Sequence, residues 1–521
     1  TMFENIIFWA GYIALWAAVV RYDIHMFQHN SYRVERYARW YRSNSNILRS
    51  ALIAFLVALS FIPVYKWAVL TAIALTMFSE AWREFRATYK KPIVYTMRVK
   101  RMLLTAGLLT AAVIALALCF IPKYAPTVAL ALLIMPMVML LANLINKPLE
   151  AAISRWYYND AKRILRSMPD LKIIGVTGSF GKTSTKHYLY RILSERYNVL
   201  MTPGNFNTTL GVIRTVREHL KPHHQIFIVE MGAKQVGDIK EICELVNPSI
   251  GVVTAVGEMH LETFGSLENV RKTKFELLDA LPANGLGVVN MDSAPIAEGA
   301  MPSHCRTIGY GVANANTHYR AEQIDYAPSQ TTFSILAQGT VREGYATHLA
   351  GRGNILNLLA AVAVADYLGV PQAQQMRAMR QIEQIEHRLS IKRTAGGITI
   401  IDDAYNSNPA GAEMALEVLR DFQRPSAARR IMVTPGFVEM GESQHRNNRE
   451  LGCKIATSAD VAIVVNKVNR DAITEGLRQG GMAESQIILA DSFAEASAHL
   501  AAMMHAGDVV LYENDLPDSF K

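Results

Sequence analysis

The sequence predicts an α/β protein in which two α/β domains follow a multi-helix transmembrane region. Three observations support this fold class. Residues 1–148 contain long uncharged apolar runs, residues 170–386 alternate apolar strands with helical stretches around a glycine-rich loop, and residues 387–521 repeat this alternation without the loop. A chain of 521 residues is long enough for several domain cores.

Composition and charge narrow the function classes. Half of the residues are apolar and 19% are charged, which argues against a disordered or coiled-coil protein. The four cysteines lie far apart, so neither a disulfide scaffold nor a cysteine-rich zinc site is expected. Residues 1–166 hold 20 Lys and Arg against 7 Asp and Glu, a net charge of +13, and the remainder has −5. The positive charge therefore lies in the apolar third, which favours membrane lipids as partners and excludes nucleic acid.

Five apolar runs predict about five membrane crossings, with the short second and third runs fitting a shallow hairpin. The runs cover approximately residues 5–20, 51–65, 67–79, 102–121 and 125–145. Basic residues gather in segments 21–49 and 80–101, so the positive-inside rule places these segments and everything after residue 147 in the cytoplasm. Aromatic residues among these arginines indicate interfacial anchoring or, alternatively, a lipid-phosphate site.

A basic amphipathic linker, residues 149–169, leads to the glycine-rich loop Gly175–Ser184. The loop reads GVTGSFGKTS and lies between a predicted strand at 171–176 and a predicted helix at 182–197. In such loops, backbone N–H groups surround a polyphosphate, a lysine reaches the terminal phosphate oxygens, and a threonine hydroxyl ligates Mg²⁺. The spacing is a variant, because the strict pattern would have glycine in place of Val176. We expect ATP to contact Gly178, Ser179, Gly181, Lys182, Thr183 and Ser184.

Two further predicted strands end in side chains suited to a metal ion. Glu230 follows the strand at 225–229, and His260 lies after the strand at 250–255. The carboxyl ends of parallel strands share one edge of a sheet, which is also where the glycine-rich loop lies. A carboxylate oxygen suits Mg²⁺, so Glu230 is the first candidate ligand. The alternatives are a solvated strand cap for Glu230 and a hydrogen-bonded structural residue for His260.

Taken together, these motifs and several others resemble the Mur ligase family. The segments that carry the resemblance, in order, are GVTGSFGKTS, Thr202–Asn207, VEMGAKQVGDI, His260–Leu267, Lys272–Glu276, Glu386–Leu389 and Asp402–Pro409. The resemblance covers about residues 170–515 and is nearest to the branch that adds D-alanyl-D-alanine in peptidoglycan synthesis. It implies a central P-loop ATPase domain over 170–386 and a Rossmann-like ligase domain over 387–521. Together with the apolar runs, it predicts location in a bacterial inner membrane.

The resemblance also implies the chemistry. Such enzymes phosphorylate a carboxylate with ATP and Mg²⁺, and an amine then attacks the acyl phosphate. By this likeness the catalytic residues would be Lys182, Lys274 and His260, and the metal ligands Thr183, Glu230, His260 and a carbamylated Lys274. Asn290, Arg388 and Asp403 would join the ATP site, and Asn205, Asn207, Tyr405, Asn406 and Asn408 would contact substrate. Without carbamylation, Lys274 would be a surface helix residue, and the alternative for Asp403 is a turn-forming acid.

The sequence departs from the family pattern at several places. Gly353 replaces the histidine of GRHNxxN, and an acidic segment, Glu513–Asp518, replaces the Lys-Gly-Ser-Arg that follows the last strand. Membrane helices also replace the domain that holds a UDP-sugar. We therefore expect a cell-envelope precursor, UDP-linked or lipid-linked, as acceptor and an amino acid or dipeptide as donor. Two other functions stay open, a P-loop ATPase that energises its own membrane helices and an inactive ligase-derived scaffold.

Overall fold

The computed structural model describes residues 2–30, 32–43, 79, 82, 86, 92–120, 134–259, 261–326, 330–405 and 408–515. The chain forms two compact units, residues 1–156 and residues 157–516. All predicted site residues belong to the second unit.

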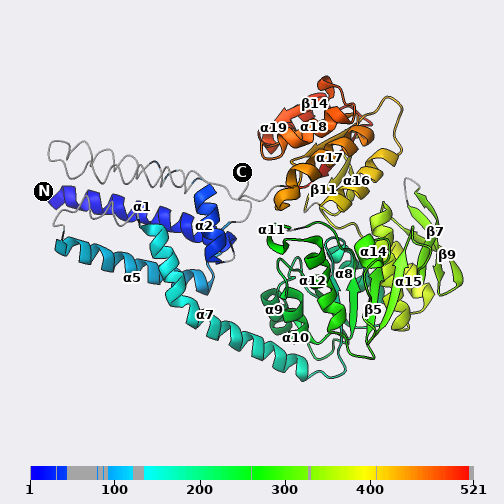
Figure 1. Ribbon diagram of the computed structural model, residues 1–521, viewed down its shortest axis with the longest axis horizontal. Helices are drawn as coiled ribbons and strands as arrows, with labels where there is room; N and C mark the ends of the chain where they lie inside the picture. Colours follow the sequence, from blue (N-terminus) through cyan, green and yellow to red (C-terminus); the bar gives the residue numbers. More distant parts are fainter. Residues whose placement is uncertain are drawn as a thin grey trace. The chain divides into compact units, whose positions relative to one another are not determined.

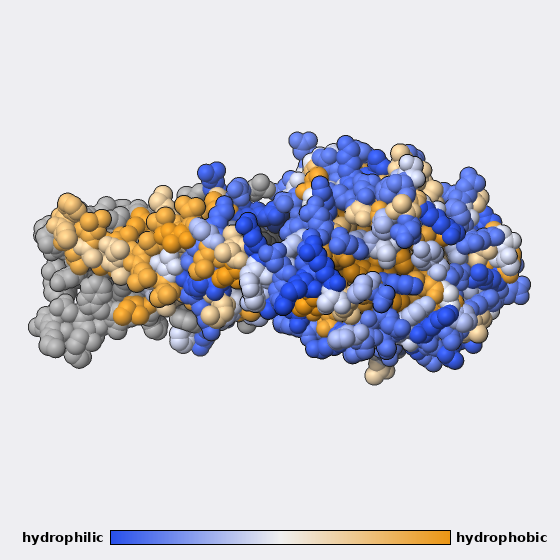
Figure 2. All heavy atoms as spheres, turned by 90° about the horizontal axis from the view of Figure 1, so that it is seen from below, coloured by the Kyte–Doolittle hydropathy of each residue, from blue (hydrophilic) through white to orange (hydrophobic). Residues whose placement is uncertain are grey.

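The described part of the first unit is mainly helical (Figure 1). Its helices are α1 (Met2–His29), α2 (Val34–Ser43), α5 (Met97–Phe120) and the first part of α7 (Met135–Arg166). Their buried faces share one core, which includes Ile24, Phe27, Met102, Ala106 and Met139. Figure 2 shows hydrophobic residues gathered on the outer surface of these helices, whereas the visible surface of residues 157–516 is mostly hydrophilic.

Within the described residues, α5 is the one helix whose length and composition would let it cross a membrane. Leu104, Leu108, Leu116 and Phe120 on this helix are each more than 60% exposed. The predicted runs at 51–65 and 67–79 lie almost entirely outside the described residues, so the expected five crossings stay a prediction. The described part of the fifth run and most of the predicted linker belong to one helix, α7, which continues through Pro148.

The second unit begins with a nine-stranded sheet in the order β2-β3-β1-β4-β5-β6-β7-β8-β9. Its strands are β1 (Lys172–Thr177), β2 (Val199–Met201), β3 (Ile226–Glu230), β4 (Ile250–Val253), β5 (Leu286–Asn290), β6 (Arg306–Gly311), β7 (Tyr319–Tyr326), β8 (Thr331–Ala337) and β9 (Thr340–Thr347). The strands from β2 to β7 pair in parallel, and β7, β8 and β9 pair antiparallel. The α/β prediction is confirmed, and the antiparallel extension adds three strands that the sequence patterns did not reveal.

Helices cover both faces of this sheet. One face packs against α8 (Lys182–Leu193), α14 (Arg352–Tyr367) and α15 (Gln372–Arg380). The other face packs against α9 (Thr209–His219), α10 (Asp238–Val246) and α12 (Leu267–Asp279), with α11 (Leu261–Phe264) and α13 (Ala294–Ala297) near the strand ends. Strands β1, β3 and β4 are apolar and fully buried along nearly their whole length, as expected for parallel strands covered on both faces.

Residues 387–515 form a second, six-stranded sheet in the order β10-β11-β15-β12-β13-β14. Its strands are β10 (Ser390–Arg393), β11 (Thr399–Asp403), β12 (Arg430–Thr434), β13 (Val461–Val465), β14 (Ile487–Ala490) and β15 (Val509–Glu513). Helices α16 (Pro409–Asp421), α17 (Gln444–Ser458), α18 (Arg470–Gln479) and α19 (Phe493–Met503) pack on it, with short 3₁₀ turns at Gly441–Ser443 and Glu484–Gln486. Five of the six strands are parallel, as in a Rossmann-like domain.

Candidate nucleotide and metal site

The glycine-rich loop turns sharply between β1 and α8 because two glycines lie where a side chain does not fit. Gly178 and Gly181 have φ values of 152° and 79°. A Cβ on Gly178 would lie 2.1 Å from the Thr254 hydroxyl, and one on Gly181 would lie 2.6 Å from Oδ1 of Asn357. The Ser179 N–H donates to the carbonyl of Ala255 at 2.8 Å, which ties the loop to the residues after β4. The loop is therefore held in the shape that presents its backbone to a phosphate.

Lys182 begins α8 and folds back over the loop. Its ammonium donates hydrogen bonds of 2.6 Å and 3.1 Å to the carbonyls of Gly178 and Ser179. Burial lowers the pKa of Lys182 to about 8, although the nearby charge of Glu230 partly opposes this shift. The side chain is thus still mostly protonated at pH 7 and lies at the phosphate-binding end of the loop.

Glu230 ends β3 and is the carboxylate at the centre of the site. It is 1% exposed, and its Oε1 accepts hydrogen bonds from the Thr183 hydroxyl at 3.2 Å and the Asn207 amide at 3.3 Å. The Lys186 ammonium lies 3.0 Å from its Oε2. Burial alone would raise the pKa of Glu230, but the charges of Lys186 and Lys182 outweigh burial and lower it. The carboxylate is therefore ionised at neutral pH.

The pair of Thr183 and Glu230 fits a magnesium ion. Hard oxygen ligands, one carboxylate and several water or phosphate oxygens are typical of Mg²⁺ sites in nucleotide-binding proteins. The described residues contain no cluster of three or more His, Cys, Asp or Glu side chains that could hold a metal, here or elsewhere, so water and phosphate oxygens would supply the other ligands. His260 lies outside the described residues, so its predicted role stays a prediction.

Lys274 is buried in α12, so the surface-helix alternative is wrong. The side chain is 3% exposed. Burial, followed by the charge of Lys182, lowers the pKa of Lys274 to about 7, while Asp238 and Glu276 oppose the shift. A lowered pKa favours the neutral amine, and an amine must be neutral to react with CO₂. Burial of Lys274 therefore favours the protonation state from which a lysine can be carbamylated.

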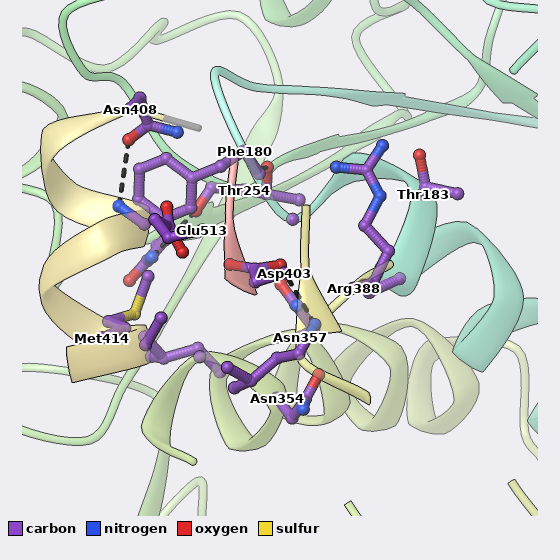
Figure 3. A pocket seen from close by; sticks show the side chains of 18 residues that line it. Phe180, Thr183, Thr254, Asn354, Asn357, Arg388, Asp403, Asn408, Met414 and Glu513 are labelled. Atoms are coloured by element: carbon purple, nitrogen blue, oxygen red, sulfur yellow. Dashed lines mark hydrogen bonds between the residues drawn. The ribbon is translucent and has the colours of Figure 1, made fainter. Parts of the chain in front are cut away.

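A pocket extends from the loop toward the second sheet (Figure 3). In Figure 3, Thr183 and Arg388 lie toward one end of the pocket, Phe180, Met414 and Glu513 toward the other, and Asp403 between them. The remaining lining residues come mainly from α14 and α16 and include Gly353, Asn354, Asn357 and Asn408. The pocket combines polar and charged side chains of the loop and the second sheet with the apolar side chains of Phe180 and Met414, which suits a nucleotide.

Arg388 and Asp403, which were predicted to join the ATP site, both line this pocket. The Arg388 guanidinium lies 4.1 Å from the centre of the Tyr405 ring, and Asp403 accepts a hydrogen bond of 3.0 Å from the N–H of Leu389. Burial raises the pKa of Asp403 to about 6, although the charge of Arg388 opposes the shift. The hydrogen bond to Leu389 is one that a turn-forming acid would make. Asp403 also lines the pocket, which a turn-forming role alone does not explain.

Four other predicted residues, Asn290, Asn408, Asn205 and Tyr405, have hydrogen-bond partners in the structure. The Asn290 amide donates to the Thr254 carbonyl at 2.8 Å, and its oxygen accepts from the N–H of Asp292. Asn408 is the N-cap of α16, where it accepts from the Gly411 N–H at 3.0 Å. The amide of Asn205 donates to the Tyr405 hydroxyl at 2.7 Å, which joins the loop after β2 to the second sheet. Asn406 lies outside the described residues.

The sequence patterns did not reveal three residues of this site. Lys186 pairs with Glu230, Phe180 lines the pocket, and Met414 fills the space beside Gly353, where a Cβ would lie 3.1 Å from the Met414 sulfur. For Lys186, the one signal in the sequence was its position four residues after Lys182, since residues four apart lie on the same helix face. The contribution of Met414 depends on the packing of α16 against α14, which spacing does not predict.

Replacing Asp403 with asparagine is expected to stabilise the fold and weaken nucleotide binding. The folded-state pKa of about 6 lies above the ordinary value of 3.8, so Asp403 lowers the free energy of unfolding progressively as the pH rises from about 4 to about 6. The melting temperature of Asp403→Asn should therefore exceed that of the wild type at pH 8 and match it near pH 4. Thermal denaturation at both pH values checks this, and an equal shift at both would contradict it.

Comparison with known proteins gives two family matches. Residues 176–365 match the Mur ligase middle domain, and residues 387–512 match the Mur ligase glutamate ligase domain. The UDP-N-acetylmuramoyl-tripeptide–D-alanyl-D-alanine ligase of Mycobacterium tuberculosis is 33% identical over 366 residues, which are 66% of this chain and 70% of that protein. The enzyme of the same name from Bacillus subtilis is 28% identical over 285 residues, which are 55% of this chain and 60% of that protein.

Solved structures are similar over the same region. MurF from Acinetobacter baumannii superposes with a TM-score of 0.61 at 25% identity, covering 69% of this chain and 76% of that one. MurF from Thermotoga maritima, solved in complex with ADP, gives a TM-score of 0.60 at 25% identity, covering 69% and 80%. Residues 1–175 lie outside both family matches.

Proposed function

Because the chain belongs to the Mur ligase family, we propose that it is an ATP-dependent ligase that forms an amide bond in peptidoglycan synthesis, with a MurF-like reaction. The observation that carries this proposal is the convergence of three parts at one place. The phosphate loop, the buried Glu230 carboxylate and the Arg388–Asp403 pair of the second sheet all surround the same region. A nucleotide-only ATPase would not need a buried lysine, Lys274, within the influence of the Lys182 charge.

The proposed reaction has two steps. The acceptor carboxylate attacks the γ-phosphorus of ATP, the bond to the β-phosphate oxygen breaks, and ADP leaves. The amine of the donor then attacks the acyl carbon, loses a proton, and expels phosphate. Lys182 and the loop N–H groups hold the phosphate oxygens, and Arg388 supplies positive charge from the second sheet. Mg²⁺, held by Thr183 and Glu230, would neutralise phosphate charge when bound.

Lys274 is proposed to act as a carbamate. Carbamylation would convert a buried cation into an oxygen donor near the charge of Lys182, and that positive charge favours the anionic product. His260 is proposed to share the metal that this carbamate would hold. Asn205, Asn207 and Tyr405 are proposed to contact the substrate, because they join the loop after β2 to the second sheet beside Glu230.

The acceptor is proposed to be a cell-envelope precursor presented at the bacterial inner membrane. The exposed apolar face of α5 and the apolar, basic composition of residues 1–166 support a membrane location with the catalytic domains on the cytoplasmic side. A lipid-linked acceptor fits a chain with membrane helices where the family has a UDP-sugar domain. Asp515 and Asp518, in the acidic segment that stands where the family has a basic one, favour an amine donor that is more cationic than D-alanyl-D-alanine.

The central test is the nucleotide product. Purified full-length protein with ATP, Mg²⁺ and an acceptor extract should release ADP and phosphate only when an amine donor is present. Formation of AMP would exclude acyl-phosphate chemistry, and release without any acceptor would favour an ATPase. Mass spectrometry of envelope precursors that accumulate on depletion of the protein would identify the acceptor.

Deleting residues 1–146 is expected to leave nucleotide binding within about twofold of the wild type. Every described residue of the loop and pocket lies beyond residue 156, and the cores of the second unit contain no residue from the first. The deletion should move the protein from the membrane fraction to the soluble fraction, because α5 presents its apolar face outward. Cell fractionation and ATP titration check both expectations. A truncated protein that stays with the membranes would contradict the anchor assignment.

A further inference from the structure

Lys186 is a buried lysine that the proposed reaction does not use. It lies one turn after Lys182 on α8, and its side chain is 0% exposed. Its ammonium lies 3.0 Å from Oε2 of Glu230 and donates a hydrogen bond of 2.6 Å to the carbonyl of Gly204. Burying an ion pair usually adds little stability over an apolar pair of the same size. The pair is therefore better explained by what it does to Glu230 and to the Gly204 loop.

The two oxygens of Glu230 have different surroundings. Oε2 is next to Lys186, whereas Oε1 accepts hydrogen bonds from Thr183, at the start of the phosphate-loop helix, and from Asn207. Only Oε1 therefore faces the hydroxyl that would share a metal with it. A carboxylate limited to one oxygen suits the octahedral geometry of Mg²⁺, while Ca²⁺ readily takes both oxygens of one carboxylate.

The same ammonium also fixes the loop after β2. Gly204 has a φ of 50°, and its carbonyl accepts from Lys186. Two residues of this loop reach other parts of the site, since Asn205 contacts Tyr405 and the Asn207 carbonyl accepts from the Gly232 N–H at 2.7 Å. One charged group thus sets the position of the carboxylate and of the loop beside it.

We propose that Lys186 is a positioning residue that holds Glu230 as a one-oxygen metal ligand and anchors residues 203–207 next to it. The inference rests on the proposed function in one respect, the assignment of a metal to Glu230. Lys186 acts through Glu230, because its ammonium is already engaged by two protein oxygens. Without it, both carboxylate oxygens become available and the site loses its preference for the smaller cation.

Metal binding to the full-length protein tests this inference without turnover. Mn²⁺ is bound to each variant, followed by electron paramagnetic resonance, and displaced with Mg²⁺ or Ca²⁺. The measured quantity is the Ca²⁺ concentration that displaces half of the Mn²⁺, divided by the Mg²⁺ concentration that does the same. This ratio should be about tenfold lower in Lys186→Met than in the wild type. Hydrogen exchange should also become faster in residues 203–207. Lys186→Arg keeps the charge and should stay close to the wild type in the ratio of Ca²⁺ to Mg²⁺.

Leu189→Ala is the matched control, because Leu189 is buried on the same helix but packs in the apolar core. It should lower the melting temperature without changing the Ca²⁺ to Mg²⁺ ratio or the exchange of residues 203–207. A folded Lys186→Met with the wild-type ratio and wild-type exchange would overturn the inference. If Lys186→Met does not fold, Lys186→Gln, which keeps a hydrogen-bond donor, replaces it. The Ca²⁺ to Mg²⁺ ratio and the hydrogen exchange of residues 203–207 are then measured on Lys186→Gln, with the same outcomes for the inference.

Failure of the proposed function gives a different result. Glu230→Gln, with Lys186 unchanged, should lose most of its Mn²⁺ binding. If Glu230→Gln binds Mn²⁺ as the wild type does, the metal assignment fails and the inference fails with it. If Glu230→Gln loses binding and Lys186→Met behaves as the wild type, only the role of Lys186 is overturned.

Discussion

Lys274→Ala is expected to lose at least roughly three orders of magnitude in turnover, because it removes the group proposed to become a metal-binding carbamate. The pKa of about 7 makes the Lys274 amine reactive toward CO₂ at neutral pH, whereas an ordinary lysine is less than about 0.1% neutral there. Initial rates of ADP release, measured with saturating ATP and acceptor, check the loss. Short carboxylates such as formate or acetate should restore part of the activity by supplying the missing oxygen ligand.

The exposed Lys272 lies on the same helix and provides the control. Lys272→Ala should keep wild-type turnover. Nuclear magnetic resonance with ¹³C-labelled bicarbonate should show a carbamate signal in the wild type and in Lys272→Ala, and none in Lys274→Ala. Full turnover in a folded Lys274→Ala would remove this residue from the reaction, and a loss that no carboxylate relieves would leave the lysine necessary without supporting the carbamate.

Lys182→Met is expected to lower kcat/KM for ATP by at least about 100-fold to 1,000-fold, because it removes the cation at the phosphate end of the loop. The unbranched methionine keeps much of the side-chain volume, so the free energy of unfolding should change little. The pKa of about 8 adds a second expectation. Lys182 loses its proton as the pH rises through 8, so turnover of the wild type should decline between about pH 8 and pH 9.

Lys221→Met serves as the control, since Lys221 is exposed in the loop after α9. Its kcat/KM and its pH profile should match those of the wild type. The profile of the wild type must be measured on protein that stays folded across the range. If Lys182→Met keeps its activity, or if the alkaline decline persists unchanged in it, Lys182 is not the group that titrates.

The phosphate loop and the α/β class were predictable because both depend on residues close together in the chain. The spacing of glycines, Lys182 and Thr183 between an apolar strand and a helix specifies a turn at the helix N-terminus. The structure has that turn, with Gly178 and Gly181 at positive φ. Glu230 was predictable for a related reason, because a side chain after a parallel strand lies at the edge where the loop lies.

The roles of Asn290 and Asn408 were not predictable in the same way. Both line the pocket, yet Asn290 bonds to the Thr254 carbonyl and Asn408 caps α16. Backbone groups that lose water on folding need partners, and which side chain supplies them depends on the packing of distant segments. The antiparallel strands β7 to β9 were missed although they are seven or eight residues long, because polar and charged residues interrupt the apolar pattern of β7 and β9.

By itself, the sequence determined the chemistry that this protein carries: a phosphate loop, carboxylates after parallel strands, and a basic apolar third ahead of them. The tertiary structure alone decided how those groups act on one another. Strand order places β3 and β4 on either side of β1, so Glu230 meets Lys186 across the sheet edge and the burial of Lys274 shifts its pKa toward neutrality. Burial and charge pairing act through space, and residues that are far apart in the chain come within their range only once the fold has formed.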